Sequence, residues 1–300
     1  MRAGIGEKLL MTAIYGFLIG LGFVTLYPFW NSFVISLNAG ADTAFGGITF
    51  WPRAFTLDNY VVVLKDGRFM NGFLIAVLRV LVGTVLSIFF TAMLAYGMSR
   101  RQVVFKKYYM IFFIITMFFS GGLIPFYMVV RELGMLNTFW VMVVPGIISV
   151  WNMIIFRTFF QELPDGLEES AKIDGCTNFG IFFRIVFPVS GPVFATLSLF
   201  TAVYHWNDWF NPAIFINNSH LLPVSAVLQQ ILNSNLAQEM IAQSTGGNAA
   251  ALDALTRART VTNKSLSMAT MVVATIPIIA VYPFLQKYFV KGVLVGSLKG

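Results

Sequence analysis

The carboxylates of this apolar chain are grouped in a way that points to a function. Five of them lie between Glu162 and Asp174, and Lys172 is the one basic residue among them. An interfacial helix resting on lipid headgroups is one interpretation, but its charge has the wrong sign for an anionic inner leaflet. The segment therefore favours a polar surface on which another protein docks.

Two short helices are predicted around these carboxylates. Asp165 is expected to cap the first helix through its side-chain oxygen. Glu168 and Glu169 then fall in its first turn, where the helix dipole favours negative charge. Gly175 is expected to turn the chain sharply, because glycine adopts conformations that other residues avoid. With Thr177 as the cap of the second helix, the pattern predicts a compact knob that presents Glu169.

A second polar cluster lies near the end of a later apolar run. Ionisable residues within a membrane are costly and often mark pathways. Aromatic faces beside amide and carboxylate groups suit sugar rings, so one interpretation is a substrate path or gate. The other interpretation is an aromatic belt or a subunit contact at the outer end of the fifth span. The candidate path residues here are Tyr204, Trp206, Asn207, Asp208 and Trp209.

Arg79 is an isolated cation in the second apolar run. It is expected either to extend outward toward the membrane surface or to line the same path.

Other kinds of site find little support in this sequence. The chain has no G-x-x-x-x-G-K-[ST] phosphate loop, so it is not expected to hydrolyse ATP alone. His205 and His220 are its histidines, and no metal site or catalytic triad follows from their spacing. Cys176 is the single cysteine, which excludes an internal disulfide. We predict a non-catalytic protein without a cofactor of its own.

The composition places the chain in a membrane. It is 57% hydrophobic and 11% charged, against about 25% charged residues in an ordinary soluble domain. The net charge is +7, but the basic residues lie at the ends of apolar runs. This distribution does not favour a nucleic-acid partner. A spanning helix needs about 20 apolar residues, and six candidates appear in an all-α single domain, 1–300. They are about 9–37, 73–98, 108–130, 136–160, 185–216 and 266–289.

The basic residues orient these spans. With both termini cytoplasmic, twelve Lys and Arg residues fall in inner segments and seven in outer ones. Cytoplasmic loops carry the excess of Lys and Arg. The cluster 100–107 between spans two and three is the best anchor, and it places the 163–188 loop in the cytoplasm.

Several spans contain helix-breaking residues. Breaks free backbone carbonyls, which a bilayer tolerates only where protein or a watery cavity surrounds them. Several broken helices together favour a translocation path over a simple anchor, whereas any one proline alone is alternatively a packing kink. The expected interruptions are Pro28, 120–125, Pro145, Pro188 with Pro192, and Pro277 with Pro283.

The long outer loop, 217–264, contains an amphipathic stretch, 224–232, that predicts a short helix. A Gly- and Ala-rich tip follows. It is either a solvated connector or a finger toward an external binding protein. The candidate contact residues are Thr245, Gly246, Gly247 and Asn248.

The acidic loop also resembles a family motif. Glu169-Ser170-Ala171, Gly175, Ile185 and Phe187-Pro188 have the spacing of the EAA loop of bacterial ABC importer permeases. Ser170 and Phe187 depart from the usual Ala and Leu. The stretches 133–138, 156–160 and 296–300 resemble the carbohydrate-uptake branch that includes the maltose permease subunit. The chain is thus similar to that family over roughly 10–300, which implies a MetI-like transmembrane fold with a cytoplasmic coupling helix.

The resemblance implies a mechanism and a set of partners. The 163–188 loop would seat in a separate ATPase and act as a lever that switches the permease between inward-facing and outward-facing states. The partners would be a second permease, two ATP-binding cassette subunits that hold ATP and Mg, and an extracytoplasmic solute-binding protein in a bacterial inner membrane. The substrate would be a saccharide, with an acidic oligomer such as alginate as one option. The coupling residues would be Glu168, Glu169, Ala171, Asp174 and Gly175.

Two other classes of function remain open at this stage. A secondary transporter or channel would work without an ATPase, and a membrane enzyme would turn over substrate alone. No motif in the sequence supports the enzyme.

Overall fold

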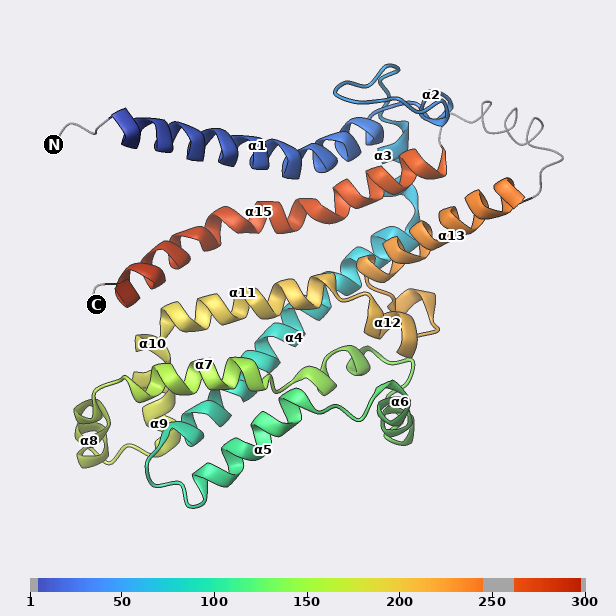
Figure 1. The fold of residues 1–300 in the computed structure, drawn as a ribbon. Coiled ribbons are helices and arrows are strands. Elements are labelled where there is room, and N and C mark those ends of the chain that lie inside the picture. Colours follow the sequence, from blue (N-terminus) through green and yellow to red (C-terminus); the bar gives the residue numbers. More distant parts are fainter. Residues whose placement is uncertain (1–4, 245–261, 298–300) are drawn as a thin grey trace. The chain divides into compact units, whose positions relative to one another are not determined.

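The computed structural model describes the backbone of residues 5–244 and 262–297, with side chains for 6–234 and 262–281. Helices form nearly all the regular structure in this part of the chain (Figure 1). Strand pairing there is limited to one antiparallel bridge, between Asn38 and Phe55. The all-α class expected from the sequence is confirmed.

Three continuous helices contain stretches long and apolar enough to cross a membrane. They are α1 (Ile5–Ser36), α4 (Gly67–Ser99) and α15 (Asn263–Ser297). Three bent pairs pass the same test: α5 (Lys106–Phe118) with α6 (Leu123–Glu132) at 111°, η1 and η2 (Phe139–Gly146) with α7 (Val150–Gln161) at 44°, and the run Asn178–Val189 with α11 (Gly191–Asn207) at 85°. The described residues reach the expected six spans when each bent pair counts as one.

The bends fall where several of the sequence breakers lie. α5 ends at Phe118, and Gly122 has a φ of 85°, a left-handed conformation that favours glycine. Ser190, between Pro188 and Pro192, separates α10 (Phe187–Val189) from α11. The expected breaks at Pro28, Pro277 and Pro283 are wrong, because α1 and α15 continue through them. In a helix of more than 30 residues, the remaining backbone hydrogen bonds maintain the helix around one missing donor.

The shorter helices connect these spans. α13 (Val224–Ser244) continues well beyond the short helix expected at 224–232, because the Leu, Ala, Gln and Met residues that follow are good helix formers. The tip of the outer loop, with the candidate contact residues Thr245, Gly246, Gly247 and Asn248, lies outside the described residues. The other short elements are α2 (Gly40–Ala44), α3 (Asp58–Lys65), α8 (Asp165–Ile173), α9 (Asn178–Ile181), a π-helical turn η3 (Phe182–Val186), α12 (Phe210–Phe215) and η4 (Ser219–Leu221).

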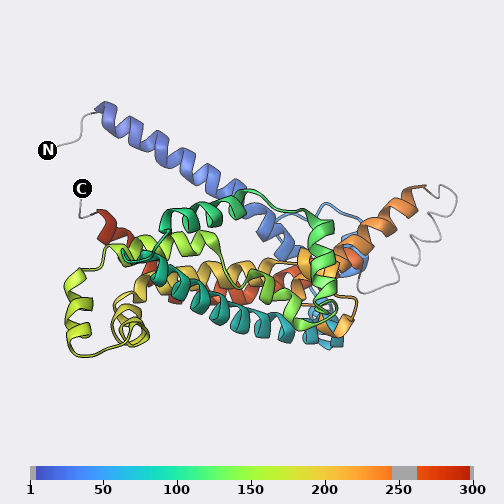
Figure 2. The same ribbon diagram turned by 90° about the horizontal axis from the view of Figure 1, so that it is seen from below.

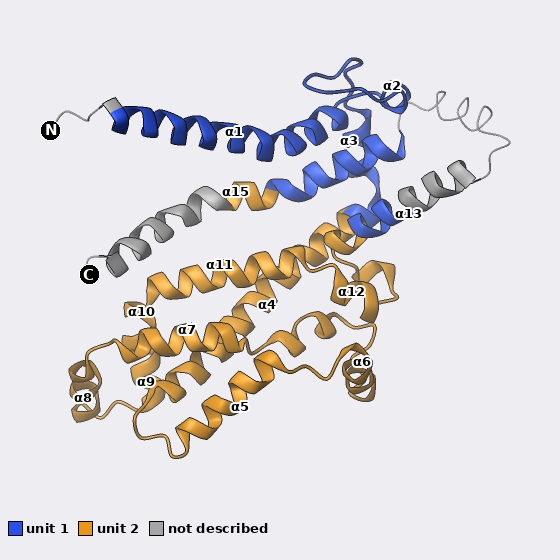
Figure 3. Cartoon of the chain, in the orientation of Figure 1, with its two compact units in different colours: residues 1–69, 228–276 blue, residues 70–227, 277–300 orange. Residues whose placement is uncertain are grey.

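The chain divides into two compact units, 1–69 with 228–276 and 70–227 with 277–300 (Figure 3). A single permease domain over 1–300 stays a prediction. In the first unit, buried amide side chains tie the segment after α1 together. The Asn59 amide donates to the carbonyls of Ser36 and Asn38 at 2.9 and 3.0 Å, and its oxygen accepts from Ser265 Oγ at 2.9 Å.

The second unit contains the candidate coupling and path residues. Its core is aromatic: Phe156 of α7 and Phe194 of α11 lie 4.7 Å apart between ring centroids, and Phe182 and Ile181 pack into the same buried cluster. α8 and α9 lie at one end of this unit, whereas α6 and α12 lie at the other (Figures 1 and 2). The acidic knob and the polar cluster after α11 are therefore at opposite ends of the same helices.

Candidate functional site

The acidic loop folds as two short helices that meet at Gly175. This residue has a φ of 79°, and the amide of Cys176 donates to the carbonyl of Ala171 at 2.9 Å, which closes the end of α8. Thr177 caps α9 by accepting from the Gly180 amide at 3.2 Å, as expected. The expected capping role of Asp165 is wrong. Pro164 holds the capping position and Asp165 begins α8, so its carboxylate acts on the helix dipole instead.

The five predicted coupling residues divide between two faces of the knob. Glu169, Asp174 and Gly175 are exposed. Glu168 is only 8% exposed, and Ala171 packs into the aromatic core of the unit. The knob thus has an exposed acidic face and a face that anchors it to the helices beneath.

The anchoring face contains an ion pair that the sequence analysis missed. The guanidinium of Arg100, which follows α4, pairs with the carboxylate of Glu168 and lies 4.3 Å from the ring centroid of Tyr96. Arg101 also approaches Asp165, at 3.5 Å, but that pair is largely exposed. The sequence contains part of the signal for this pair, because Glu168 and Ala171 share one helix face and Arg100 belongs to the basic cluster 100–107.

A second ion pair lies buried at the other end of the unit. Arg79 Nη2 and Asp208 Oδ2 are 2.5 Å apart, and their side chains are 1% and 8% exposed. Arg79 also donates to the carbonyl of Asp208 at 2.8 Å and to that of Met142 at 3.4 Å. Arg79 therefore does not extend outward, and the pair joins the second and fifth predicted spans.

Asp208 also ends one helix and starts the next. α11 stops at Asn207, and the Asp208 carboxylate accepts from the amide of Asn211 at 3.2 Å in α12. The continuous span expected over 185–216 is wrong at this point, because α11 ends at Asn207 and a new helix, α12, begins at Phe210.

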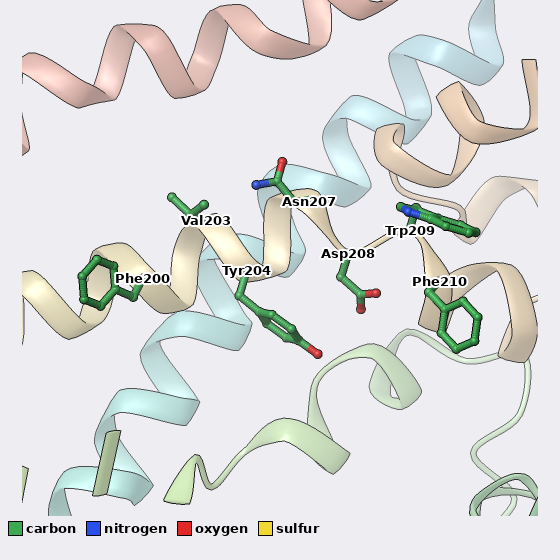
Figure 4. A pocket seen from close by; sticks show the side chains of 7 residues that line it. All are labelled: Phe200, Val203, Tyr204, Asn207, Asp208, Trp209 and Phe210. Carbon is green, nitrogen blue, oxygen red and sulfur yellow. The ribbon is translucent and has the colours of Figure 1, made fainter. Parts of the chain in front are cut away.

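A cavity of about 440 Å³ opens beside this break (Figure 4). It brings together Tyr204, Asn207, Asp208 and Trp209 of the predicted path. Trp206 does not line it: this indole is buried, with its ring at an edge-to-face angle to Phe73. The lining also includes three residues that sequence reasoning did not select, Phe200, Val203 and Phe210.

A neighbouring cavity of about 320 Å³ is more polar than the sequence indicated. Asn152 of α7 donates to Thr201 of α11 at 3.1 Å, and Ser87 of α4 lines the same space. His205 closes it, packed so tightly that a Cβ on Gly83 would lie 2.6 Å from its Nε2. Single polar residues in apolar helices gave no periodic signal by which these could have been found.

Metal ligation finds no support in the part of the chain that the structure describes. No group there of three or more His, Cys, Asp or Glu residues fits a metal ion. The absence of a cofactor in this chain stays a prediction.

Comparison with known proteins places the chain in a family. The family model described as "binding-protein-dependent transport system inner membrane component" matches residues 87–295. The Bacillus subtilis (strain 168) polygalacturonan/rhamnogalacturonan transport system permease protein YtcP is 37% identical over 98% of this chain and 99% of its own length. Protein LplC of the same strain is 40% identical over 95% and 92%.

A solved chain, from a bacterial ABC transporter involved in the import of the acidic polysaccharide alginate, matches with a TM-score of 0.84. The two sequences are 23% identical, and the match covers 96% of this chain and 99% of the solved chain. This match confirms the fold.

The chain belongs to the family of binding-protein-dependent transport system inner membrane components. It is a multi-pass inner-membrane permease subunit of an ABC importer, and permeases of this family are generally non-catalytic. Such a subunit works with a partner permease, an ATPase and a substrate-binding protein. The expected membership of the ABC importer permease family is confirmed.

Proposed function

We propose that this chain forms half of the path by which an ABC importer takes up an oligosaccharide or polysaccharide fragment. ATP and Mg would be held by two partner ATPase subunits, since this sequence lacks a phosphate loop. Both termini and the 163–188 loop would be cytoplasmic, in keeping with the distribution of Lys and Arg. The outer tip at 245–248 would face the solute-binding protein.

The observation that carries the coupling role is the two-faced knob. Its exposed side offers Glu169 and Asp174 together with Ile173, which is 86% exposed. A large apolar side chain so exposed among carboxylates fits a cleft of a partner protein. The buried side ties α8 to the end of α4 through Glu168 and Arg100. A displacement of α8 by the ATPase is therefore transmitted to α4.

The cavity beside Asp208 supports a saccharide as substrate. Tyr204 and Trp209 offer exposed aromatic faces, and Asn207 offers an amide at the same surface. Sugar rings are bound by stacking on aromatic faces and by hydrogen bonds to their hydroxyls. The nearby cation, Arg79, is already paired with Asp208. This lining therefore suits the uncharged face of a saccharide, whether or not the polymer carries acids elsewhere.

The coupling role is tested with Glu169→Lys and Gly175→Asp in the complete transporter. Both variants should insert in the membrane normally but lose at least tenfold in co-purified ATPase or in substrate-stimulated ATP hydrolysis. Glu162→Lys, the same charge change at an exposed residue that precedes α8, is the control. Normal assembly and stimulated turnover in both knob variants would contradict the docking role. Uptake driven by an ion gradient without the ATPase would instead indicate a secondary transporter.

The path is tested separately with Tyr204→Ala. It should reduce saccharide uptake without reducing the amount of ATPase bound, because Tyr204 is in the last turn of α11, and that end of α11 lies away from α8 and α9 (Figure 1). Unchanged uptake across saccharides would count against this cavity as part of the path.

A further inference from the structure

A third cavity lies against the inner side of the knob, in the second unit. Its volume is about 330 Å³, and it is bounded by the end of α4, the loop that follows, the end of α8 and the start of α9. Neither the coupling role nor the substrate path uses it. The lining residues are Met93, Tyr96, Gly97, Arg100, Gln102, Val103, Lys172, Asn178, Phe179 and Phe182.

The charged residues of this lining are both cations, Arg100 and Lys172. Glu168 pairs with one nitrogen of Arg100, Nη1. The other two, Nε and Nη2, are buried and have no hydrogen-bond partner within the described part of the chain. Leaving a charged donor buried without an acceptor is costly. Arg100 therefore has two unsatisfied donors at the wall of the cavity, and the charges of Arg100 and Lys172 favour an anionic occupant.

Water alone does not supply both a hydrogen-bond acceptor for Arg100 and a negative charge. It would accept from Nε and Nη2, but it would bring no negative charge to Lys172, Lys106 or Arg157, which form no ion pair within the described part of the chain, whereas Arg100 and Arg101 are paired with Glu168 and Asp165. The wider basic cluster is dense: Lys106 donates to the carbonyls of Ser99 and Arg100 at 3.0 and 3.1 Å, and Arg157 donates to that of Met98 at 3.3 Å. A phosphate presents several acceptor oxygens and a negative charge together, and guanidinium groups bind it in a bidentate manner.

The apolar surroundings point to a lipid as the source of that phosphate. α4, a candidate membrane span, ends at Ser99, so the cavity lies at the end of a span. Beyond it, Val104 and Phe105 are exposed beside Lys106 and Lys107. Exposed apolar side chains next to Lys and Arg are typical of a segment lying in the headgroup region. Met93, Phe179 and Phe182 continue the apolar surface within the cavity.

We propose that this cavity binds the headgroup of an anionic glycerophospholipid from the inner leaflet. The phosphate accepts from Nε and Nη2 of Arg100 and from the Lys172 ammonium, and the acyl chains follow the apolar surface toward the bilayer. Basic pockets between helices on the cytoplasmic side are known to hold such headgroups. Inorganic phosphate shares the charge and acceptors but lacks the chains.

The position of the site gives the lipid a structural effect. Lys172 precedes Gly175, whereas Asn178 and Phe179 follow it, and Arg100 belongs to the end of α4. A bound headgroup thus contacts both arms of the knob and the helix that anchors it. The inner leaflet would restrain the same element that we propose the ATPase moves.

The test uses the complete transporter in nanodiscs of phosphatidylcholine with a minor fraction of phosphatidylglycerol. Lipids that remain bound after extraction are identified by native mass spectrometry. The wild type should retain phosphatidylglycerol in preference to phosphatidylcholine. Lys172→Gln should weaken this preference about fivefold, the effect of removing one basic contact to an anionic headgroup. Gln102→Glu, which adds a carboxylate to the lining, should weaken it at least as much.

Lys107→Gln is the matched control, because Lys107 is an exposed member of the same cluster that does not line the cavity. It should change retention by less than twofold. Equal losses in Lys107→Gln and Lys172→Gln would overturn the proposal, since they would indicate diffuse attraction to the leaflet. Displacement of the lipid by excess inorganic phosphate would assign the site to a soluble anion instead. Equal retention of the two lipids by the wild type would also overturn it.

Discussion

Removing the carboxylate of Asp208 is predicted to destabilise the permease strongly. Arg79 is 1% exposed, so Asp208→Leu leaves a buried guanidinium without its counter-charge. Breaking one partner of a buried pair costs about 3–5 kcal/mol. The carbonyls of Met142 and residue 208 still accept from Arg79. We therefore expect the lower end, about 3 kcal/mol, or roughly a hundredfold in the unfolding equilibrium constant.

The double variant Arg79→Met with Asp208→Leu separates charge from packing. It removes both charges, so the desolvation cost disappears with the attraction, and buried pairs replaced in this way are often as stable as the original. The hydrogen bond from the Asn211 amide to Asp208 is lost in either case, which costs about 1 kcal/mol. We expect the double variant to be more stable than Asp208→Leu.

The assay is reversible unfolding of the purified permease in mixed micelles of sodium dodecyl sulfate and a mild detergent. Asp165→Leu is the control, because Asp165 and Arg101 form an exposed pair, 70% and 91% accessible. Such pairs contribute about 0–1 kcal/mol. The reasoning is refuted if Asp208→Leu lowers the free energy of unfolding no more than Asp165→Leu does. It is also refuted if the double variant loses as much as Arg79→Met and Asp208→Leu lose when each is measured alone and the two losses are added.

Two further predictions concern packing and pH. Gly83→Ala should cost about 1–3 kcal/mol in the same assay, because its Cβ would lie 2.6 Å from the ring of the buried His205. Gly97→Ala, with nothing within 4 Å, should be neutral or stabilising, and equal effects of the two changes would contradict the packing argument. The pKa of Asp42 is lowered from its ordinary value of 3.8, first by the hydrogen bond from the Asn38 amide. This carboxylate therefore stabilises the fold above pH 3.8, and the contribution is lost as pH falls through the lowered pKa. Melting temperature measured against pH should fall more steeply at the acid end in the wild type than in Asp42→Asn, and parallel curves would exclude this role for Asp42.

The spans were predictable because they depend on composition and length. Apolar runs of about 20 residues predict spanning helices directly. The break expected at Gly122 is correct, because the chain there takes a conformation that few other residues adopt. Pro28 gave a wrong one. The effect of a single proline depends on whether the rest of the helix is held, which its local sequence does not express.

The local shape of the knob was predictable for a similar reason. Gly175 and Thr177 act on their immediate neighbours, so their roles follow from the residues beside them. The burial of Glu168 was not predictable in this way. Its partner, Arg100, comes from a different helix end, and the pairing depends on how α8 lies over α4.

The path residues also show that residue types can be predicted from the sequence, whereas contacts between distant residues cannot. Arg79 and Asp208 were both selected, because a charge within an apolar run is conspicuous. Their contact was not foreseen, since 129 residues separate them. Trp206 was selected by residue type alone, and the turn of α11 directs it into the protein.

The buried pair between α4 and α11 also constrains how the protein is made. Arg79 is synthesised 129 residues before Asp208. At about 5–20 residues per second, roughly 6–26 s pass between them. During that interval the second span carries an arginine without its final partner, at a cost of about 2.5–3.5 kcal/mol for insertion at a helix centre. The order of synthesis alone thus favours keeping α4 beside the insertion machinery, away from bulk lipid, until α11 emerges.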